Sequence, residues 1–90
     1  MSVDEICENY ARRKAKITVR ILDDENDMIL IEGDASALEF LGNLFLAQAR
    51  ASDCGFQIAP NSAGNALFNP DSTLGVYIHR VPCTHKTGNE

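Results

Sequence analysis

Long apolar runs are missing from this sequence. No segment reaches the roughly 18 consecutive apolar residues of a membrane-spanning helix. The N-terminus MSVDEICENY is acidic, whereas a secretory signal begins with basic residues and continues with apolar ones. Tryptophan is absent, proline occurs three times, and neither an internal repeat nor a low-complexity segment is found. These absences predict a soluble cytoplasmic protein.

Cysteine is also scarce, and its number is odd. Cys7, Cys54 and Cys83 are widely spaced, which does not suit the disulfide framework of a small secreted domain. The sequence therefore predicts three reduced thiols. Cys54 is expected to be buried beside a core strand, and Cys7 and Cys83 to lie near exposed ends of the chain.

What is present is the composition of a small globular protein. Hydrophobic residues make up 44% of the 90 residues and charged residues 23%, which is close to the average for folded domains. A chain of this length has room for one core. We expect one domain over residues 16–82, preceded by an arm or short helix at 1–15 and followed by a flexible tail at 83–90.

Charge is distributed unevenly along the chain. The net charge is −5, yet five of the eight basic residues fall within the first twenty positions. Residues 23–39 hold seven acids and no base, namely Asp23, Asp24, Glu25, Asp27, Glu32, Asp34 and Glu39. Such a block repels nucleic acid and attracts basic partners. Direct binding to DNA or RNA is therefore not expected.

The first regular elements form a predicted hairpin. Residues 16–22 alternate, so Ile17, Val19 and Ile21 should face the core while Thr18 and Arg20 face the other way. Residues 28–32 form a second β-rich run after the polar turn 23–27. Two strands joined by five turn residues favour antiparallel pairing.

A helix is predicted to follow Gly33 and to end near Ala51. Ser36 and Glu39 fit a capping box, with Asp34 as the competing cap. Gly55 is placed to stop the chain in a left-handed turn. The expected buried stripe consists of Leu38, Leu41, Leu44, Phe45 and Gln48. Phe40 and Leu46 lie outside this stripe and are the candidate residues for self-association.

Two further strands complete the expected fold. They are residues 55–59 and residues 73–81, and the turn-rich segment between them should send Leu67 and Phe68 into the core. Tyr77 and His79 should face outward with Thr18 and Arg20, on one open sheet face that can bind a partner. The order β-β-α-β-β predicts an α+β, two-layer domain, in which one antiparallel sheet of about four strands packs one face against the main helix.

Motifs for catalysis or cofactor binding are weak. His79, Cys83 and His85 offer a zinc-like ligand set, but a fourth ligand is missing from the string. The acidic turn at residues 23–27 lacks the glycine and glutamate of a calcium-binding EF-hand loop. No glycine-rich phosphate loop is present. We expect no metal, no cofactor and no enzyme activity, and keep a zinc or thiol enzyme as a rival interpretation.

A family resemblance rests on several short segments. The run from Ile29 to Asp34, ILIEGD, is followed by Ala37-Leu38, by LGNL at residues 41–44, and by STL at residues 72–74 before the strand from Val76 to Arg80. Over roughly residues 16–81, this pattern resembles the bacterial Immunity protein 32 family, which is associated with polymorphic toxin systems.

The resemblance implies an antidote that neutralises a cognate toxin by binding, without turnover of its own. The expected partner is a cognate protein toxin, for instance a basic nuclease. From the charge pattern we expect an acidic rim as the contact surface, with Tyr77 as an aromatic anchor if the open face of the sheet docks. That rim comprises Asp23, Asp24, Glu25, Asp27 and Glu32. The alternative is a small self-associating structural or regulatory domain, a homodimer through Phe40 and Leu46.

Overall fold

A computed structural model describes residues 1–23 and 26–83. In chain order the elements are α1 (Val3–Arg12), β1 (Thr18–Asp23), β2 (Met28–Glu32), α2 (Ala35–Arg50), β3 (Gly55–Ile58), the short 3-10 helix η1 (Asn65–Leu67) and β4 (Val76–His79). The predicted α+β class with four antiparallel strands is confirmed. No helix among the described residues is long and apolar enough to cross a membrane.

The strands form two separate two-stranded sheets, so the prediction of one sheet was wrong. β1 pairs with β2, and β3 pairs with β4. The outer edge of β1 is covered by an irregular segment instead of by β4. The backbone N–H of Asn69 donates to the Ile17 carbonyl at 2.7 Å, and the backbone N–H of Thr73 donates to the Val19 carbonyl at 2.9 Å. Pro70 lies between these contacts and has no amide to donate, so a regular strand cannot form there.

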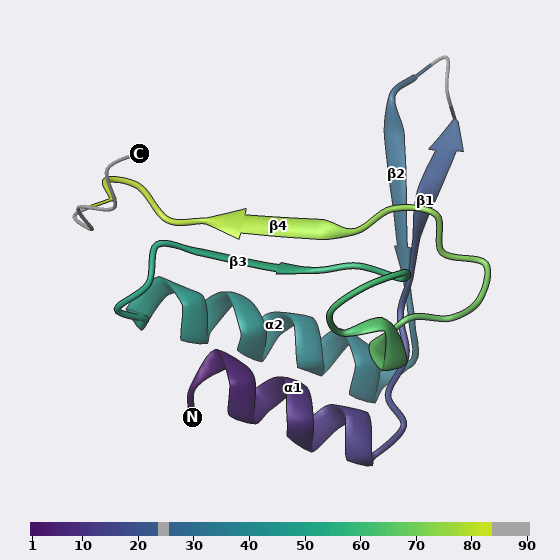
Figure 1. Ribbon diagram of the computed structural model, residues 1–90. Coiled ribbons are helices and arrows are strands. Elements are labelled where there is room, and N and C mark those ends of the chain that lie inside the picture. Colours follow the sequence, from purple (N-terminus) through teal and green to yellow (C-terminus); the bar gives the residue numbers. More distant parts are fainter. Residues whose placement is uncertain (24–25, 84–90) are drawn as a thin grey trace.

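Helix α1 belongs to the hydrophobic core. Ser2 and Glu5 form a capping box at its start, and the hydrogen bond from the Ser2 amide to Glu5 Oε1 lowers the pKa of Glu5. Ile6 and Tyr10 are buried, and the Tyr10 ring centroid lies 5.5 Å from that of Phe40. Figure 1 shows α1 running beside α2, and the β3–β4 ribbon running along α2.

Helix α2 buries a different stripe from the one predicted. The buried residues are Ala37, Phe40, Leu41, Leu44 and Gln48. Leu38 and Phe45, which were expected inside, are about half exposed. The helix is apolar on more than one side, so periodicity alone does not determine which side is buried. Because α1 covers the side that carries Phe40, that side is buried. Asp34 is the N-cap, because its carboxylate accepts from the Ala37 amide at 2.9 Å.

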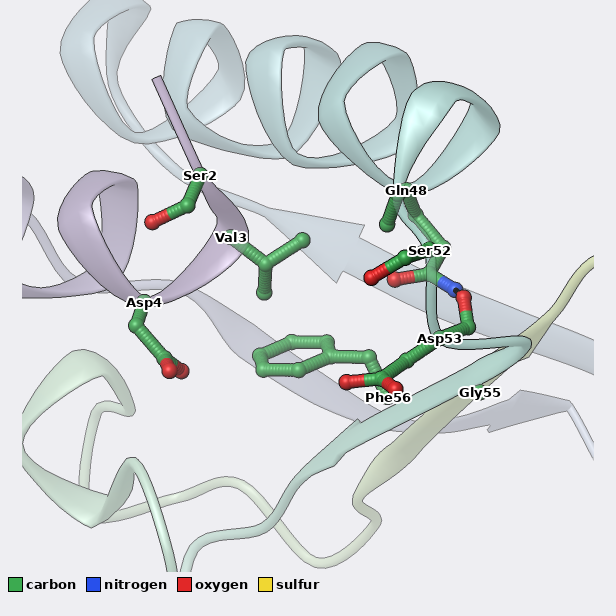
Figure 2. A pocket seen from close by; sticks show the side chains of 9 residues that line it. Ser2, Val3, Asp4, Gln48, Ser52, Asp53, Gly55 and Phe56 are labelled. Carbon is green, nitrogen blue, oxygen red and sulfur yellow. Dashed lines mark hydrogen bonds between the residues drawn. The ribbon is translucent and has the colours of Figure 1, made fainter. Parts of the chain in front are cut away.

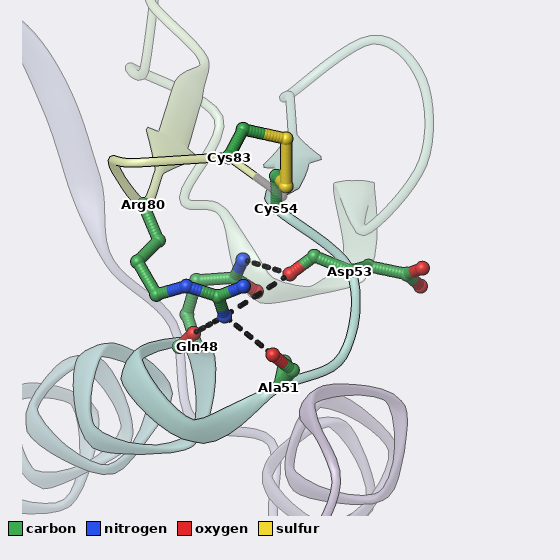
Figure 3. Close-up of a disulfide and its surroundings, with 6 residues drawn as sticks. All are labelled: Gln48, Ala51, Asp53, Cys54, Arg80 and Cys83. Atoms are coloured by element: carbon green, nitrogen blue, oxygen red, sulfur yellow. Dashed lines mark hydrogen bonds between the residues drawn. A yellow bond between two sulfur atoms is a disulfide. The ribbon is translucent and has the colours of Figure 1, made fainter. Parts of the chain in front are cut away.

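The C-terminal end of α2 is capped by side-chain hydrogen bonds and not by a glycine in the left-handed conformation. The helix ends at Arg50, and Ala51 is already extended. Arg80, just beyond β4, donates to the carbonyl oxygens of Gln48 and Ala51 (Figure 3). A cation at this end also complements the helix dipole. Gly55 lies instead within β3, where the Tyr77 ring of β4 packs over it.

A disulfide joins Cys54 to Cys83, which corrects the prediction of three reduced thiols. The Cα atoms of these residues are 5.5 Å apart although 29 positions separate them in sequence. Antiparallel pairing of Gly55 with His79 brings the two chain segments together (Figure 3). Cys7 is the free cysteine among the described residues. Spacing alone does not reveal such a pair, because it depends on the pairing of β3 with β4.

Candidate protein-binding surface

The base of the β1–β2 hairpin is held by buried polar contacts. The Ser72 hydroxyl donates to the Ile17 carbonyl at 3.2 Å and accepts from the Val19 amide at 3.1 Å. Ile17 and Val19 are themselves buried. Each buried polar group therefore has a partner, which is the condition for burying it without a large cost.

Thr18 also takes part in these polar contacts, which we call the hairpin anchor. The sequence had predicted Thr18 on an open face. It is buried, its hydroxyl donates to Asp71 Oδ1 at 2.9 Å, and it accepts from Asn69 Nδ2 at 3.1 Å. The prediction was wrong because the irregular segment that carries Asn69 and Asp71 covers this face of β1. The anchor thus fixes where the hairpin leaves the body of the molecule.

Beyond Val19 the hairpin extends away from the core (Figure 1). Directly opposite residues share a face, and Ile21 pairs with Ile29 just as Val19 pairs with Ile31. Ile21, Ile29 and Ile31 are 48%, 60% and 49% exposed. We call these three side chains the hairpin face. The prediction that Ile21 is buried was wrong, because the strand continues past the body that buries Ile17 and Val19.

A shallow hollow lies beside the hairpin face. It has a volume of about 410 Å³ and is lined by Ile21, Asp27, Met28, Ile29 and Leu74. All but Asp27 are apolar. A concave, mostly apolar surface of this kind can accommodate a large side chain of a binding partner.

Of the predicted acidic rim, Asp23 and Asp27 lie beside the turn of the hairpin, and Glu32 lies at its base, opposite Thr18. Asp27 and Glu32 are exposed, whereas Asp23 accepts two hydrogen bonds from Asn26 and so helps to close the turn. Asp24 and Glu25 lie outside the described residues. Asp27 and Glu32 therefore lie at the two ends of β2, with Glu32 on the face opposite the three isoleucines, and the role of the acids in binding stays a prediction.

Tyr77 lies on a different sheet from the acidic rim. It is 67% exposed on β4, and its ring meets that of His79 edge to face at 6.2 Å. Tyr77 and His79 are exposed as predicted. Arg20, predicted on the same open face, is half-buried on β1. Because β1 and β4 belong to different sheets, the single binding face expected from the sequence does not form.

The two residues predicted for self-association have different environments. Phe40 is fully buried, so it cannot contact a second copy of the chain. Leu46 is 54% exposed and lines a hollow of about 260 Å³ between the helices, together with Tyr10, Arg13 and Arg50. The Tyr10 hydroxyl donates to Glu39 and accepts from Asn43, so it is already occupied.

Another hollow, of about 210 Å³, lies where the start of α1 meets the α2–β3 connection (Figure 2). Val3 and Phe56 point toward each other across it, and the oxygen atoms of Asp4, Ser52 and Asp53 lie around them. Across the described part of the chain, no cluster of three His, Cys, Asp or Glu residues is arranged to hold a metal ion.

The rival interpretations of a zinc site or a thiol enzyme both required Cys83 as a free thiolate. The sulfur of Cys83 is bonded to Cys54, so it is not a thiolate that can bind zinc or attack a substrate. His85 lies outside the described residues. Burial, with a smaller contribution from Asp4, raises the pKa of the Cys7 thiol to about 11. A thiol with a raised pKa is a poor nucleophile at neutral pH.

The hairpin face was not identified from the sequence. The alternating isoleucines indicate a strand with one apolar face. The same pattern occurs whether the strand packs on the core of the domain or extends beyond it. Comparisons with protein-family models, with curated proteins and with solved structures give no match to this chain. The resemblance to the immunity family therefore stays a prediction.

Proposed function

We propose that this chain is a non-enzymatic binding protein and that the β1–β2 hairpin is the part that docks on its partner. The observation that carries the proposal is the half-exposed hairpin face of Ile21, Ile29 and Ile31 on an element that is firmly anchored at its base. Neighbouring apolar side chains left in water at the surface of a small domain are characteristic of protein interaction sites. Rigid anchoring lowers the entropy cost of binding.

The partner that fits the charge is basic. Exposed acids lie at both ends of β2, and complementary charge speeds encounter and discriminates against acidic surfaces. In line with the resemblance to the immunity family, we propose a cognate bacterial toxin as this partner. The chain would then neutralise the toxin by covering its functional surface.

Co-expression tests this function. The product of the gene adjacent and upstream is expressed in cells with and without this chain, and growth and complex formation are measured. Ile29→Asp should abolish protection. Leu46→Asp is the matched control, since Leu46 is similarly exposed but lies on α2. A neighbouring product that is harmless, or that stays toxic and forms no complex with the wild-type chain, would refute the proposal.

Self-association is the second candidate, and one observation favours it. Leu38, Gly42 and Phe45 lie on one exposed side of α2, and nothing lies within 4 Å of a Cβ built on Gly42. A second copy could approach closely along this stripe. Sedimentation at micromolar concentration should then detect a dimer that Phe45→Asp dissociates. A monomer for the wild-type chain would exclude this candidate.

A further inference from the structure

We propose that the outer edge of β2 accepts an extended, basic segment of another protein, which adds to the hairpin as a third strand. The inference rests on the proposed binding function and specifies its contact. Within the described residues β2 pairs only with β1, so its other edge is open. An open edge is a template for strand addition.

Hydrogen bonds at Val19 show which way the main chain of β2 points. The Val19 amide donates to the Ser72 hydroxyl at 3.1 Å, and its carbonyl accepts from the amides of Thr73 at 2.9 Å and Leu74 at 3.1 Å. Both groups therefore point away from β2. Opposite residues in an antiparallel pair either exchange both bonds or turn both sets of groups outward. Since Val19 lies opposite Ile31, the amide and carbonyl of Ile31 also point outward.

The same alternation extends toward the turn. Arg20 and Leu30, the next opposite pair, have their main-chain groups between the strands, and Ile21 and Ile29 again have theirs outside. The outer edge of β2 thus presents the amide and carbonyl groups of Ile29 and Ile31. These four groups suffice to pair with a short extended segment.

The side chains specify what that segment should look like. Ile29 and Ile31 supply both the outward main-chain groups and two of the three side chains of the hairpin face. Residues of an added strand that bond to them would place their own side chains on the same face. The segment should therefore carry β-branched or aliphatic residues at alternate positions, which would extend the apolar surface begun by Ile21.

Charge identifies the occupant as basic and not as a second copy of this chain. Asp27 precedes β2 and Glu32 ends it, and both are exposed. Arg20, the one base of the hairpin, is half-buried and shares a face with Glu32, so the exposed acids outnumber it. A second copy would bring the same acids and a net charge of −5, which opposes association. Lysine or arginine residues at the ends of the segment would instead face acids at both ends of the edge.

A synthetic peptide tests the edge directly. The probe is Lys-Val-Thr-Val-Lys with acetylated and amidated ends, titrated into the isotopically labelled chain while amide resonances are followed. Shifts should concentrate at Ile29 and Ile31. The peptide with glutamate in place of lysine, and the peptide with N-methylated valines, should each bind about tenfold more weakly. Equal binding by the N-methylated peptide would overturn strand addition.

Substitutions at Ile31 separate main-chain pairing from apolar contact. Proline keeps more apolar surface than alanine but lacks the amide, and because this amide points outward, Ile31→Pro should leave the pairing with β1 intact. Strand addition predicts that Ile31→Ala weakens peptide binding by about threefold and Ile31→Pro by about tenfold. The reverse order would overturn the proposal. Unchanged amide resonances of the β1 residues in Ile31→Pro would verify that the hairpin is retained.

The edge proposal and the toxin proposal fail in different ways. Peptide binding at β2 combined with undiminished toxicity in the co-expression experiment would support the edge and reject the toxin as partner. A dimer in sedimentation that Ile31→Pro dissociates would show that a second copy occupies the edge, and would overturn the choice of a basic segment.

Discussion

At the scale of single residues, Phe40 and Leu46 show how burial decides the role of an apolar side chain on one helix. Phe40 is fully buried against Tyr10, whereas Leu46 is 54% exposed. Phe40→Ala should lower the free energy of unfolding by about 3 to 5 kcal/mol, because it leaves a cavity. Leu46→Ala should change it by less than about 0.5 kcal/mol. Urea denaturation of both variants tests this, and equal losses would contradict the packing.

Cys7 provides a second test at this scale. Burial raises the pKa of its thiol from 9.0 to about 11, so the native state holds the proton more tightly than the unfolded state. The contribution of Cys7 to stability is therefore complete below pH 9.0 and is lost as the pH rises toward about 11. The wild-type chain should lose stability in this window relative to Cys7→Ser, as measured by urea denaturation. Parallel pH profiles would disagree with the raised pKa.

At the scale of elements, the start of α2 distinguishes two caps that the sequence left open. Asp34 accepts from the Ala37 amide, whereas Ser36 lies inside the helix. Asp34→Ala should cost about 1 kcal/mol of stability. Ser36→Ala should cost less than about 0.5 kcal/mol. Thermal or urea unfolding measures both, and a larger loss for Ser36→Ala would restore the capping box predicted from the sequence.

The elements were predicted better than their arrangement. Met28–Glu32 was predicted with the bounds that are observed, and α2 to within a residue at its end. Local sequence determines these bounds through turn residues and caps. The separation of the sheets was missed because it depends on a contact between Val19 and the irregular segment near Ser72, more than fifty positions away. The acidic residues of the candidate site could be chosen from the charge pattern of the sequence. The exposure of the hairpin face could not be predicted, because it depends on the three-dimensional arrangement.

At the scale of the whole molecule, the disulfide ties the C-terminal end of the described chain to the α2–β3 connection. Cys54 and Cys83 enclose a loop with a sequence separation of 29. Closing a loop of this length typically stabilises a protein by about 2 to 4 kcal/mol. Reductant, or Cys54→Ser, should lower the urea midpoint accordingly, and in a reducing cytosol the same loss applies.

Cys7→Ser is the control for this experiment. Cys7 takes no part in the bond, so the variant should respond to reductant as the wild-type chain does. A wild-type chain whose stability is the same with and without reductant would show that the bond does not form in solution.

The anchor at Ser72 has a consequence for how this protein can diversify. The buried core reaches the hairpin only as far as Val19, and none of the described residues from 20 to 31 is buried, so these residues contribute little to the stability of the fold. Substitutions in this stretch can accumulate without unfolding the domain, because exposed positions tolerate change. One scaffold can therefore acquire new recognition specificities by exchanging about a dozen contiguous residues, much as binding loops vary on a constant framework.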